Sequence, residues 1–300
     1  MLNARYVYER NDTIVVPHPL ELSTYDIGDD SCGENAKIHF IAEGKELVLF
    51  TVSQNLTLHN LSIKTNLSTT ALVGKIILLQ ALQYQLRKHV RVTFCTFQLS
   101  QETNMIYLFD TIKTGHSKYL EIDIMHTTIN STKNLALTPP TMTSEQETRS
   151  KVQNNLESFL KFHMRNCTLH SLYGAIIHAR GIKSDISLES CLVVKSYFNL
   201  MASSDSHINY QMNWYFNSGV YHSITDYPPT ISKDKGNKSA EFEKEDFEFE
   251  IVNNSGDDTR SWMEQCHFID SHLQLLLFNE TTEISNCVFK GSSVLLSGSP

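Results

Sequence analysis

The sequence predicts an all-β solenoid, in which short strands repeat along the chain and stack in successive coils. A short motif recurs with the side-chain alternation of a β-strand: an apolar or small residue, one free position, and a second apolar residue. Five of the six cysteines occupy the first position of this motif. The closest copies are about 21–24 residues apart, and such periodic self-similarity indicates units that bury their apolar face by stacking on their neighbours.

We call the first position of the motif the slot. The five clearest copies have a cysteine in the slot: Cys95, Cys167, Cys191, Cys266 and Cys287. Further copies are Leu61-Ser62-Ile63, Thr127-Thr128-Ile129 and, more loosely, Trp214-Tyr215-Phe216. Because residues two apart in a strand share a face, the slot and the third position should both face the interior. The slot cysteines are then expected to form an inward ladder of reduced, structural thiols.

Longer intervals between copies predict two inserted loops in a solenoid whose coils contain about 21–24 residues. The first insertion lies near 133–158 and contains Pro139-Pro140, and the second lies near 221–260 and contains Pro228-Pro229 and an acidic stretch. The predicted organisation is an N-terminal segment of short strands and turns at 1–37, followed by the repeated coils at 38–300. Neither end resembles a natural boundary, so we expect the chain to be a fragment of a longer protein.

The sequence alone leaves two structural features undecided. Apolar residues between Leu72 and Val90 fit one face of a helix, whereas the solenoid divides the same segment into two strands. Cys32 is the one cysteine outside the slot, and the sequence does not decide whether it is paired or free.

Composition excludes several classes of protein. With 41% hydrophobic and 19% charged residues among 300, the chain is expected to fold around a sizeable core. A formal net charge of -8 gives no general attraction to nucleic acid or anionic lipid, so no nucleic-acid partner is predicted. The longest apolar runs fall far short of the roughly 20 residues of a membrane span, and the first residues lack the apolar core of a secretory signal.

Asn-X-Ser/Thr acceptor sequences for N-glycosylation are frequent in this chain. They begin at Asn11, Asn55, Asn60, Asn66, Asn130, Asn166, Asn237, Asn253 and Asn279. Their number favours a glycoprotein at an extracellular or cell-surface location. A chain rich in Ser and Thr that never enters the secretory pathway would also generate some of them.

Several segments resemble right-handed parallel β-helix proteins of the pectin-lyase-like superfamily. They are QNLTLHNLSIKT at 54–65, Asn-Cys-Thr-Leu at 166–169, Asn-Cys-Val-Phe at 286–289 and DTIVVP at 12–17. The resemblance covers most of residues 35–300 and implies a right-handed parallel β-helix. It implies little about activity, because lyases, glycoside hydrolases, adhesins and non-catalytic extracellular proteins share this coil.

The resemblance supplies a test set for catalysis. Enzymes of this superfamily use clustered acidic and basic residues on one outer sheet, and the nearest residues here are Arg180, Lys183, Asp185, Asp205 and His207. Arg180 and Lys183 are one position too far apart for the hydrolase Arg-X-Lys element, and the Asn-Thr-Asp triplet of those enzymes is missing from the sequence. No residue is therefore predicted to be catalytic, and these five serve only the alternative that the protein is an enzyme.

The other arrangement that could carry chemistry is a zinc site formed by His163, Cys167 and His170, with His178 nearby. Strand alternation would put positions 163 and 167 on one face and 170 on the opposite face, so the three could not converge. We predict no metal and no cofactor.

The favoured function is an extracellular structural or adhesive scaffold that presents β-helix faces and loops to a glycan or protein partner. Thr138–Asn155 and Tyr221–Arg260 are the predicted partner-binding loops, since loops on a rigid scaffold commonly carry function. A carbohydrate-active enzyme, or a degenerate carbohydrate-binding relative, is one alternative. The ectodomain of a membrane receptor is the other.

Overall fold

The computed structural model describes the chain in fifteen segments, which together contain all the strands discussed below. They are residues 2–3, 7–10, 13–25, 36–42, 46–67, 73–79, 87–99, 103–108, 119–132, 134–137, 159–179, 183–202, 206–224, 260–277 and 281–298. Cys32 and most of the two predicted insertions lie outside them. The described residues form β-strands connected by tight turns, and no helix.

The strands form three parallel sheets. Sheet 1 contains β1 (Leu2–Asn3), β4 (Leu20–Tyr25), β7 (Leu56–His59), β10 (Arg87–Thr93), β13 (Tyr119–Met125), β16 (Phe159–Arg165), β18 (Lys183–Glu189), β21 (His207–Gln211), β24 (Arg260–Glu264) and β27 (Thr281–Ser285). Sheet 2 contains β2 (Val7–Arg10), β5 (Ala36–Ala42), β8 (Leu61–Leu67), β11 (Thr96–Gln98), β14 (Thr128–Thr132), β17 (Thr168–Ala179), β19 (Leu192–Val194), β22 (Trp214–Phe216), β25 (His267–Ile269) and β28 (Val288–Lys290).

Sheet 3 completes each coil. Its strands are β3 (Ile14–Val16), β6 (Glu46–Val52), β9 (Val73–Leu79), β12 (Thr103–Leu108), β15 (Asn134–Leu137), β20 (Tyr197–Ala202), β23 (Gly219–Ile224), β26 (His272–Leu277) and β29 (Ser293–Gly298). The second half of β17 also belongs to sheet 3, so this strand of 12 residues joins the two sheets.

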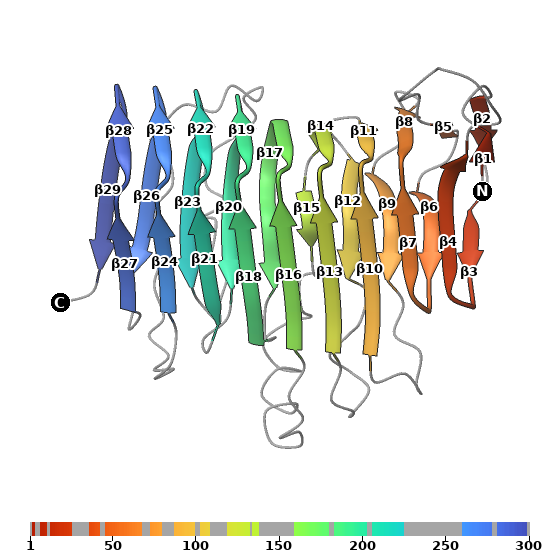
Figure 1. Cartoon of the computed structure of the whole chain (residues 1–300), viewed down its shortest axis with the longest axis horizontal. Helices are drawn as coiled ribbons and strands as arrows, with labels where there is room; N and C mark the ends of the chain where they lie inside the picture. The colour runs from red at the N-terminus through yellow and green to blue at the C-terminus, as the bar shows by residue number, and fades with distance from the viewer. Residues whose placement is uncertain are drawn as a thin grey trace, which may run out of the picture.

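The chain visits sheets 1, 2 and 3 in turn and then returns to sheet 1 one strand further on, so that the coils stack along the long axis (Figure 1). All described strand pairs are parallel, and Phe159 lies opposite Lys183, as Asp185 does opposite His207 and Arg260 opposite Thr281. The differences between these paired numbers match the predicted coil of about 21–24 residues. The predicted all-β solenoid is confirmed, as a parallel β-helix.

A left-handed residue turns the chain from sheet 1 into sheet 2 in every described coil from β7 onward. These corner residues have φ between 50° and 55° and are Asn60, Phe94, His126, Asn166, Ser190, Met212, Gln265 and Asn286. The N–H of a corner residue donates to the last carbonyl of the next strand in sheet 1, as from Asn166 to Glu189 at 3.0 Å and from Ser190 to Gln211 at 2.9 Å. The corner therefore bends the coil and binds it to its neighbour.

Side chains from all three sheets fill one continuous interior. Tyr215, Phe268 and Phe289 stack in sheet 2, with ring centroids 4.6 and 4.9 Å apart, and the first two are fully buried. Sheet 1 contributes buried aliphatic and aromatic residues in alternation with outward polar residues. Stacking identical positions at about 4.8 Å keeps each coil's apolar side chains in contact with those of the coils on either side.

The structure corrects one position of the repeat. Trp214 pairs in register with Leu192 and His267 and is 41% exposed, so it lies on the outer face and does not occupy the slot. Asn213 occupies the slot instead and is fully buried. Its Oδ1 accepts a hydrogen bond from the Cys191 N–H, and its Nδ2 donates to the Leu188 carbonyl, both at 2.8 Å. A polar residue is stable here because its amide bonds to the backbone of the preceding coil.

Described strands also lie close to the other predicted boundaries. The segment between Leu72 and Val90 contributes two strands, β9 and β10, as the solenoid alternative required. Strand β15 occupies 134–137 inside the first predicted insertion, and β23 reaches Ile224 inside the second, while 138–158 and 225–259 lie outside the described residues. Strands β1 to β4 already pair in parallel with the following coils, and β5 spans the expected boundary at residue 38.

A ladder of serines forms the corner between sheets 2 and 3 in the last four coils. Its members lie five residues after the slot and are Ser196, Ser218, Ser271 and Ser292. Each backbone N–H of the first three donates to the next hydroxyl, at 3.2, 3.2 and 3.0 Å. Each hydroxyl donates to a backbone carbonyl, as from Ser218 to Phe216 at 2.8 Å. The serine hydroxyls thus accept hydrogen bonds from buried backbone N–H groups that are not paired within the sheets.

We predict that Ser218→Ala lowers the free energy of unfolding by about 1–3 kcal/mol, because the buried Ser196 N–H loses its acceptor. Equilibrium unfolding in urea measures the change. Ser187→Ala, on the half-buried outer side of β18, is the matched control and should change stability by less than about 0.5 kcal/mol. Equal stability of the two variants would mean that the ladder is not a structural element.

Candidate functional site

The outer face of sheet 1 carries the largest described group of interacting charged side chains. In β13 the odd-numbered residues face outward and the even-numbered residues Leu120, Ile122 and Ile124 are buried in the core. The same alternation holds in β16. Because neighbouring strands are in register, the outward residues of successive coils lie side by side in rows.

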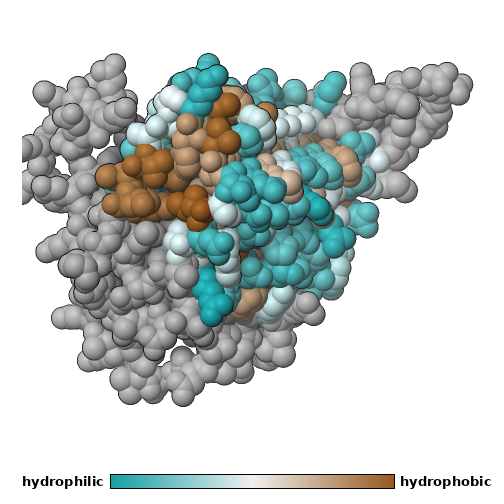
Figure 2. Space-filling view, turned by 60° about the vertical axis from the view of Figure 1, so that its left-hand side comes forward, coloured by the Kyte–Doolittle hydropathy of each residue, from teal (hydrophilic) through white to brown (hydrophobic). Residues whose placement is uncertain are grey.

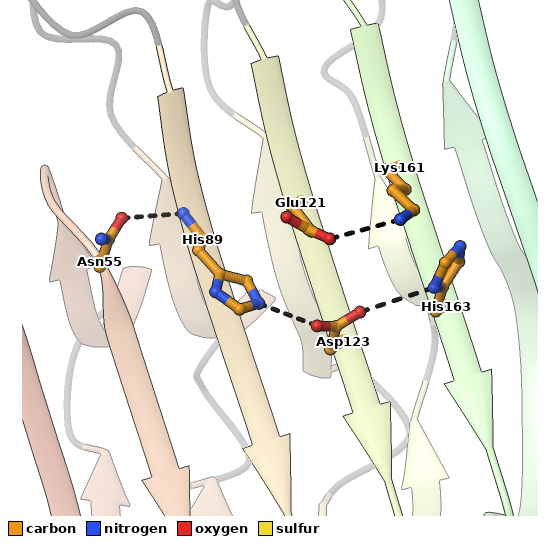
Figure 3. A network of polar contacts seen from close by, with 6 residues as sticks. All are labelled: Asn55, His89, Glu121, Asp123, Lys161 and His163. Atoms are coloured by element: carbon orange, nitrogen blue, oxygen red, sulfur yellow. Dashed lines mark hydrogen bonds and ion pairs between the residues drawn. The ribbon is translucent and has the colours of Figure 1, made fainter.

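Asp123 lies at the centre of this group. Its two carboxylate oxygens contact histidines of the coils on either side: Oδ2 is 2.9 Å from Nε2 of His89, and Oδ1 is 3.8 Å from Nδ1 of His163 (Figure 3). The side-chain Oδ1 of Asn55, one coil further, accepts a hydrogen bond from the backbone N–H of His89 at 2.9 Å. Four consecutive coils thus contribute to one polar network.

Two further ion pairs extend the network. Nζ of Lys161 lies 3.5 Å from Oε1 of Glu121, and Nη2 of Arg165 lies 3.1 Å from Oε1 of Glu189. The basic member is the more exposed one in both pairs, with side-chain exposures of 30% against 19% and 57% against 26%. The two histidines are likewise more exposed than Asp123. In this part of the described surface the basic groups are more exposed than the carboxylates, so the network offers a ligand mainly the Lys and Arg cations and imidazole nitrogens.

We call the seven residues Asn55, His89, Glu121, Asp123, Lys161, His163 and Arg165 the sheet 1 network. Sequence reasoning did not predict it, because the irregular intervals between coils hide which residues are neighbours. Alignment on the slot could have revealed it: Asp123 and His163 both lie four residues before a slot, while His89, Glu121 and Lys161 lie six residues before one.

The five residues of the catalytic test set are only partly placed. Asp185 is half-buried and lies opposite the exposed His207 in the next coil, both on the outer face of sheet 1. Lys183 begins the same strand as Asp185. Arg180 and Asp205 fall outside the described residues. Asp185 and His207 thus belong to the same outer face as the sheet 1 network, and Asp185 lies opposite Lys161.

The residues considered for zinc point in different directions, but not in the way strand alternation predicted. His163 lies on the outer face of sheet 1 and Cys167 in the interior, although alternation put both on one face. The left-handed Asn166 between them interrupts the alternation. His170 lies on sheet 2, where its Nδ1 is 2.8 Å from the Ser171 hydroxyl. Among the described residues, no three His, Cys, Asp or Glu side chains are grouped to hold a metal ion.

The slot cysteines lie in adjacent coils in two pairs. Cys95, Cys167, Cys191 and Cys266 are buried thiols and Cys287 is half-exposed; all five are free. Cys167 and Cys191 are neighbours, as are Cys266 and Cys287, because the Leu192 N–H donates to the Cys167 carbonyl at 2.8 Å and the Val288 N–H to the Cys266 carbonyl at 2.9 Å. The thiols donate to backbone carbonyls, as from Cys266 to Glu264 at 3.4 Å and from Cys287 to Ser285 at 3.3 Å. Burial raises the pKa of the Cys95 thiol to about 11. That thiol therefore stays protonated at neutral pH.

The described acceptor asparagines occupy different surroundings. Asn166 is an exposed corner residue and Asn60 a half-buried one, both left-handed. Asn55 is exposed but engages His89, and Asn130 is half-buried in β14. Asn66 lies in β8, while Asn11, Asn237, Asn253 and Asn279 are outside the described residues. Asparagine tolerates the left-handed conformation, so the corner gives Asn60 and Asn166 a structural reason that is independent of glycosylation.

The fold defines this chain as a protein of the parallel β-helix class. No family model, curated protein or solved structure matches it. Within the described segments, no helix is long and apolar enough to cross a membrane. The geometry of the sheet 1 network is thus the basis for the function proposed next.

Proposed function

We propose that this chain is an extracellular binding scaffold of the pectin-lyase-like superfamily whose sheet 1 network docks an anionic glycan. The observation that carries the proposal is the relative exposure within the four acid–base pairs of the network and its edge, where each basic side chain is more exposed than its carboxylate partner. Carboxylate or sulfate groups on a sugar chain would meet Arg165, Lys161 and His163 first.

The shape of sheet 1 supports an extended ligand. Its ten strands are stacked in one direction, so equivalent outer positions recur about every 4.8 Å along the axis (Figure 1). A polymer that lies along the sheet can contact several coils at once. Each contact that forms holds the next part of the polymer near the sheet, so the next contact forms at a smaller loss of entropy. The net charge of -8 belongs to the whole chain and does not describe this face.

We predict that the full chain binds polygalacturonate or heparin and that the double change Lys161→Ala with Arg165→Ala weakens binding at least tenfold. Each lost charge-assisted hydrogen bond contributes about 1.5–3 kcal/mol at most, and screening by salt reduces this figure at an exposed site. Titration calorimetry at two salt concentrations measures the effect.

Neutral dextran of similar length is the control ligand, and Lys290→Ala, at an exposed position of β28 on sheet 2, is the control variant. Unchanged affinity in the double variant, equal affinity for dextran, or a lack of binding to both anionic polymers would contradict the proposal.

A carbohydrate-active enzyme is the second candidate, and the two carboxylates of β13 favour it. Glu121 and Asp123 are two residues apart on one outer face, which puts them about 7 Å apart along the strand. The paired carboxyl groups of glycoside hydrolases are roughly 5–9.5 Å apart, a separation that two side chains rising from backbone positions at this spacing can adopt. Both engage basic neighbours, Asp123 through His89 and Glu121 through Lys161.

If this second function holds, the chain releases reducing ends from polygalacturonate, and Asp123→Asn or Glu121→Gln abolishes release while binding persists. The assay follows reducing ends over hours at matched protein concentrations. Glu283→Gln, an exposed carboxylate on β27, is the control and should keep full activity. Binding without any release of reducing ends would exclude the hydrolase and leave the scaffold.

A further inference from the structure

The two histidines of the sheet 1 network share one carboxylate. Asp123 lies between His89 of the preceding coil and His163 of the following coil, 2.9 Å from the first imidazole and 3.8 Å from the second (Figure 3). Both imidazoles have access to solvent, with side-chain exposures of 29% and 37%, so they can exchange protons with water. Histidine is the side chain whose charge changes between about pH 5 and pH 8.

The charge of the surrounding face depends on these two side chains. Strands β10, β13, β16 and β18 each have three outward positions before the corner, which are 89, 91, 93, 121, 123, 125, 161, 163, 165, 185, 187 and 189. The cations among them are Arg91, Lys161 and Arg165, and the carboxylates are Glu121, Asp123, Asp185 and Glu189. Three cations against four carboxylates leave a formal charge of -1 while both histidines are neutral, and protonation of both changes it to +1.

Charge decides what this face attracts, because the face has little apolar surface. Met125 is the one apolar side chain among the twelve positions. In the view of Figure 2, hydrophilic side chains cover most of the described surface, and apolar ones gather at one end of the stack. A change in the sign of the face therefore changes whether it opposes or favours an anionic polymer.

The neighbours of His89 include charges of both signs. On the following strand β13, Glu121 lies opposite His89 in register, and Asp123 contacts the imidazole. On the same strand Arg91 lies two residues further on, and the preceding strand β7 contributes the titratable His59. Protonation of His89 turns its contact with Asp123 into an ion pair.

His163 has the same carboxylate on one side. Asp123 lies opposite it on β13, and the neutral Ser187 lies opposite it on β18. The charged residues around it are Lys161 and Arg165 on its own strand, Glu121 on β13, and Asp185 and Glu189 on β18. Both cations of β16 already pair with a glutamate, so Asp123 is the carboxylate that contacts the histidines.

We propose that His89 and His163 form a pH switch that turns sheet 1 into a docking face for anionic glycans in mildly acidic solution. The switch would regulate the glycan docking proposed above, on which it rests. Near pH 7.5 histidine is mostly neutral, and the negative face opposes a polyanion. Near pH 5.5 both imidazoles take up protons, Asp123 balances one of the two positive charges, and the face becomes positive.

The test measures the affinity of the full chain for heparin near pH 7.5 and near pH 5.5, at constant ionic strength. Heparin owes most of its charge to sulfates, which stay ionised over this range. We expect binding at least about tenfold tighter at the lower pH, and a ratio below about threefold in the double variant His89→Gln with His163→Gln. The matched control is His170→Gln with His267→Gln, two half-buried histidines on the outer face of sheet 2, which should keep the full ratio.

NMR of the unaltered chain gives a second readout. Because linkage is reciprocal, bound heparin should raise the pH at which His89 and His163 take up protons, and leave the titration of His170 unchanged. Equal affinity at both pH values, an unaltered ratio in the His89 and His163 variant, or a titration that heparin does not move would overturn the switch and leave glycan docking in place. Absence of heparin binding at both pH values would overturn the docking and the switch together.

Discussion

The left-handed corner between sheets 1 and 2 is the constraint on which the rest of the structure depends. One residue with φ near 50° bends the chain without a loop, and its N–H donates to the next coil. A non-glycine residue in this conformation costs roughly 1–2 kcal/mol, which the hydrogen bond to the next coil helps to offset. The corner also interrupts the alternation of inward and outward side chains. The last residue of each sheet 1 strand faces outward, and the slot residue two positions later faces inward.

The corner also explains why the interior and the outer face are so regular. Repetition of one turn puts the slot residues and the serine ladder each at a constant offset along the coil, and it aligns the outward positions of sheet 1 in rows. Long insertions occur without disturbing these rows, because the chain leaves sheet 3 and re-enters sheet 1 in register, as from β23 to β24. A rigid scaffold that tolerates insertions can keep a binding face constant while the connecting segments vary.

The sequence predicted the parts of the fold that repeat within a single strand. Slot cysteines and their apolar third positions were visible because they lie two residues apart. The position of Asn213 in the slot was not predicted, because its role depends on hydrogen bonds to the backbone of the neighbouring coil. The apolar Trp214 was assigned to the slot instead. The prediction that 163 and 167 share a face failed because alternation takes no account of a left-handed residue at 166.

The candidate site was less predictable than the fold. Asp123 and its two histidines, His89 and His163, come from three successive coils and are far apart in the sequence, at unequal intervals. Such a group becomes visible only when the coils are aligned on the slot. The serine ladder, in contrast, lies at a fixed distance of five residues after the slot and was open to discovery from the sequence alone.

Hydrogen exchange at the corner amides is the most direct test of this winding. The amides of Asn166, Ser190 and Gln265 donate to carbonyls of the following coil, so each should exchange as slowly as the core amides of β16 and β18. Exchange of these three amides within seconds, as in a solvent-exposed turn, would show that the coils do not stack in this register.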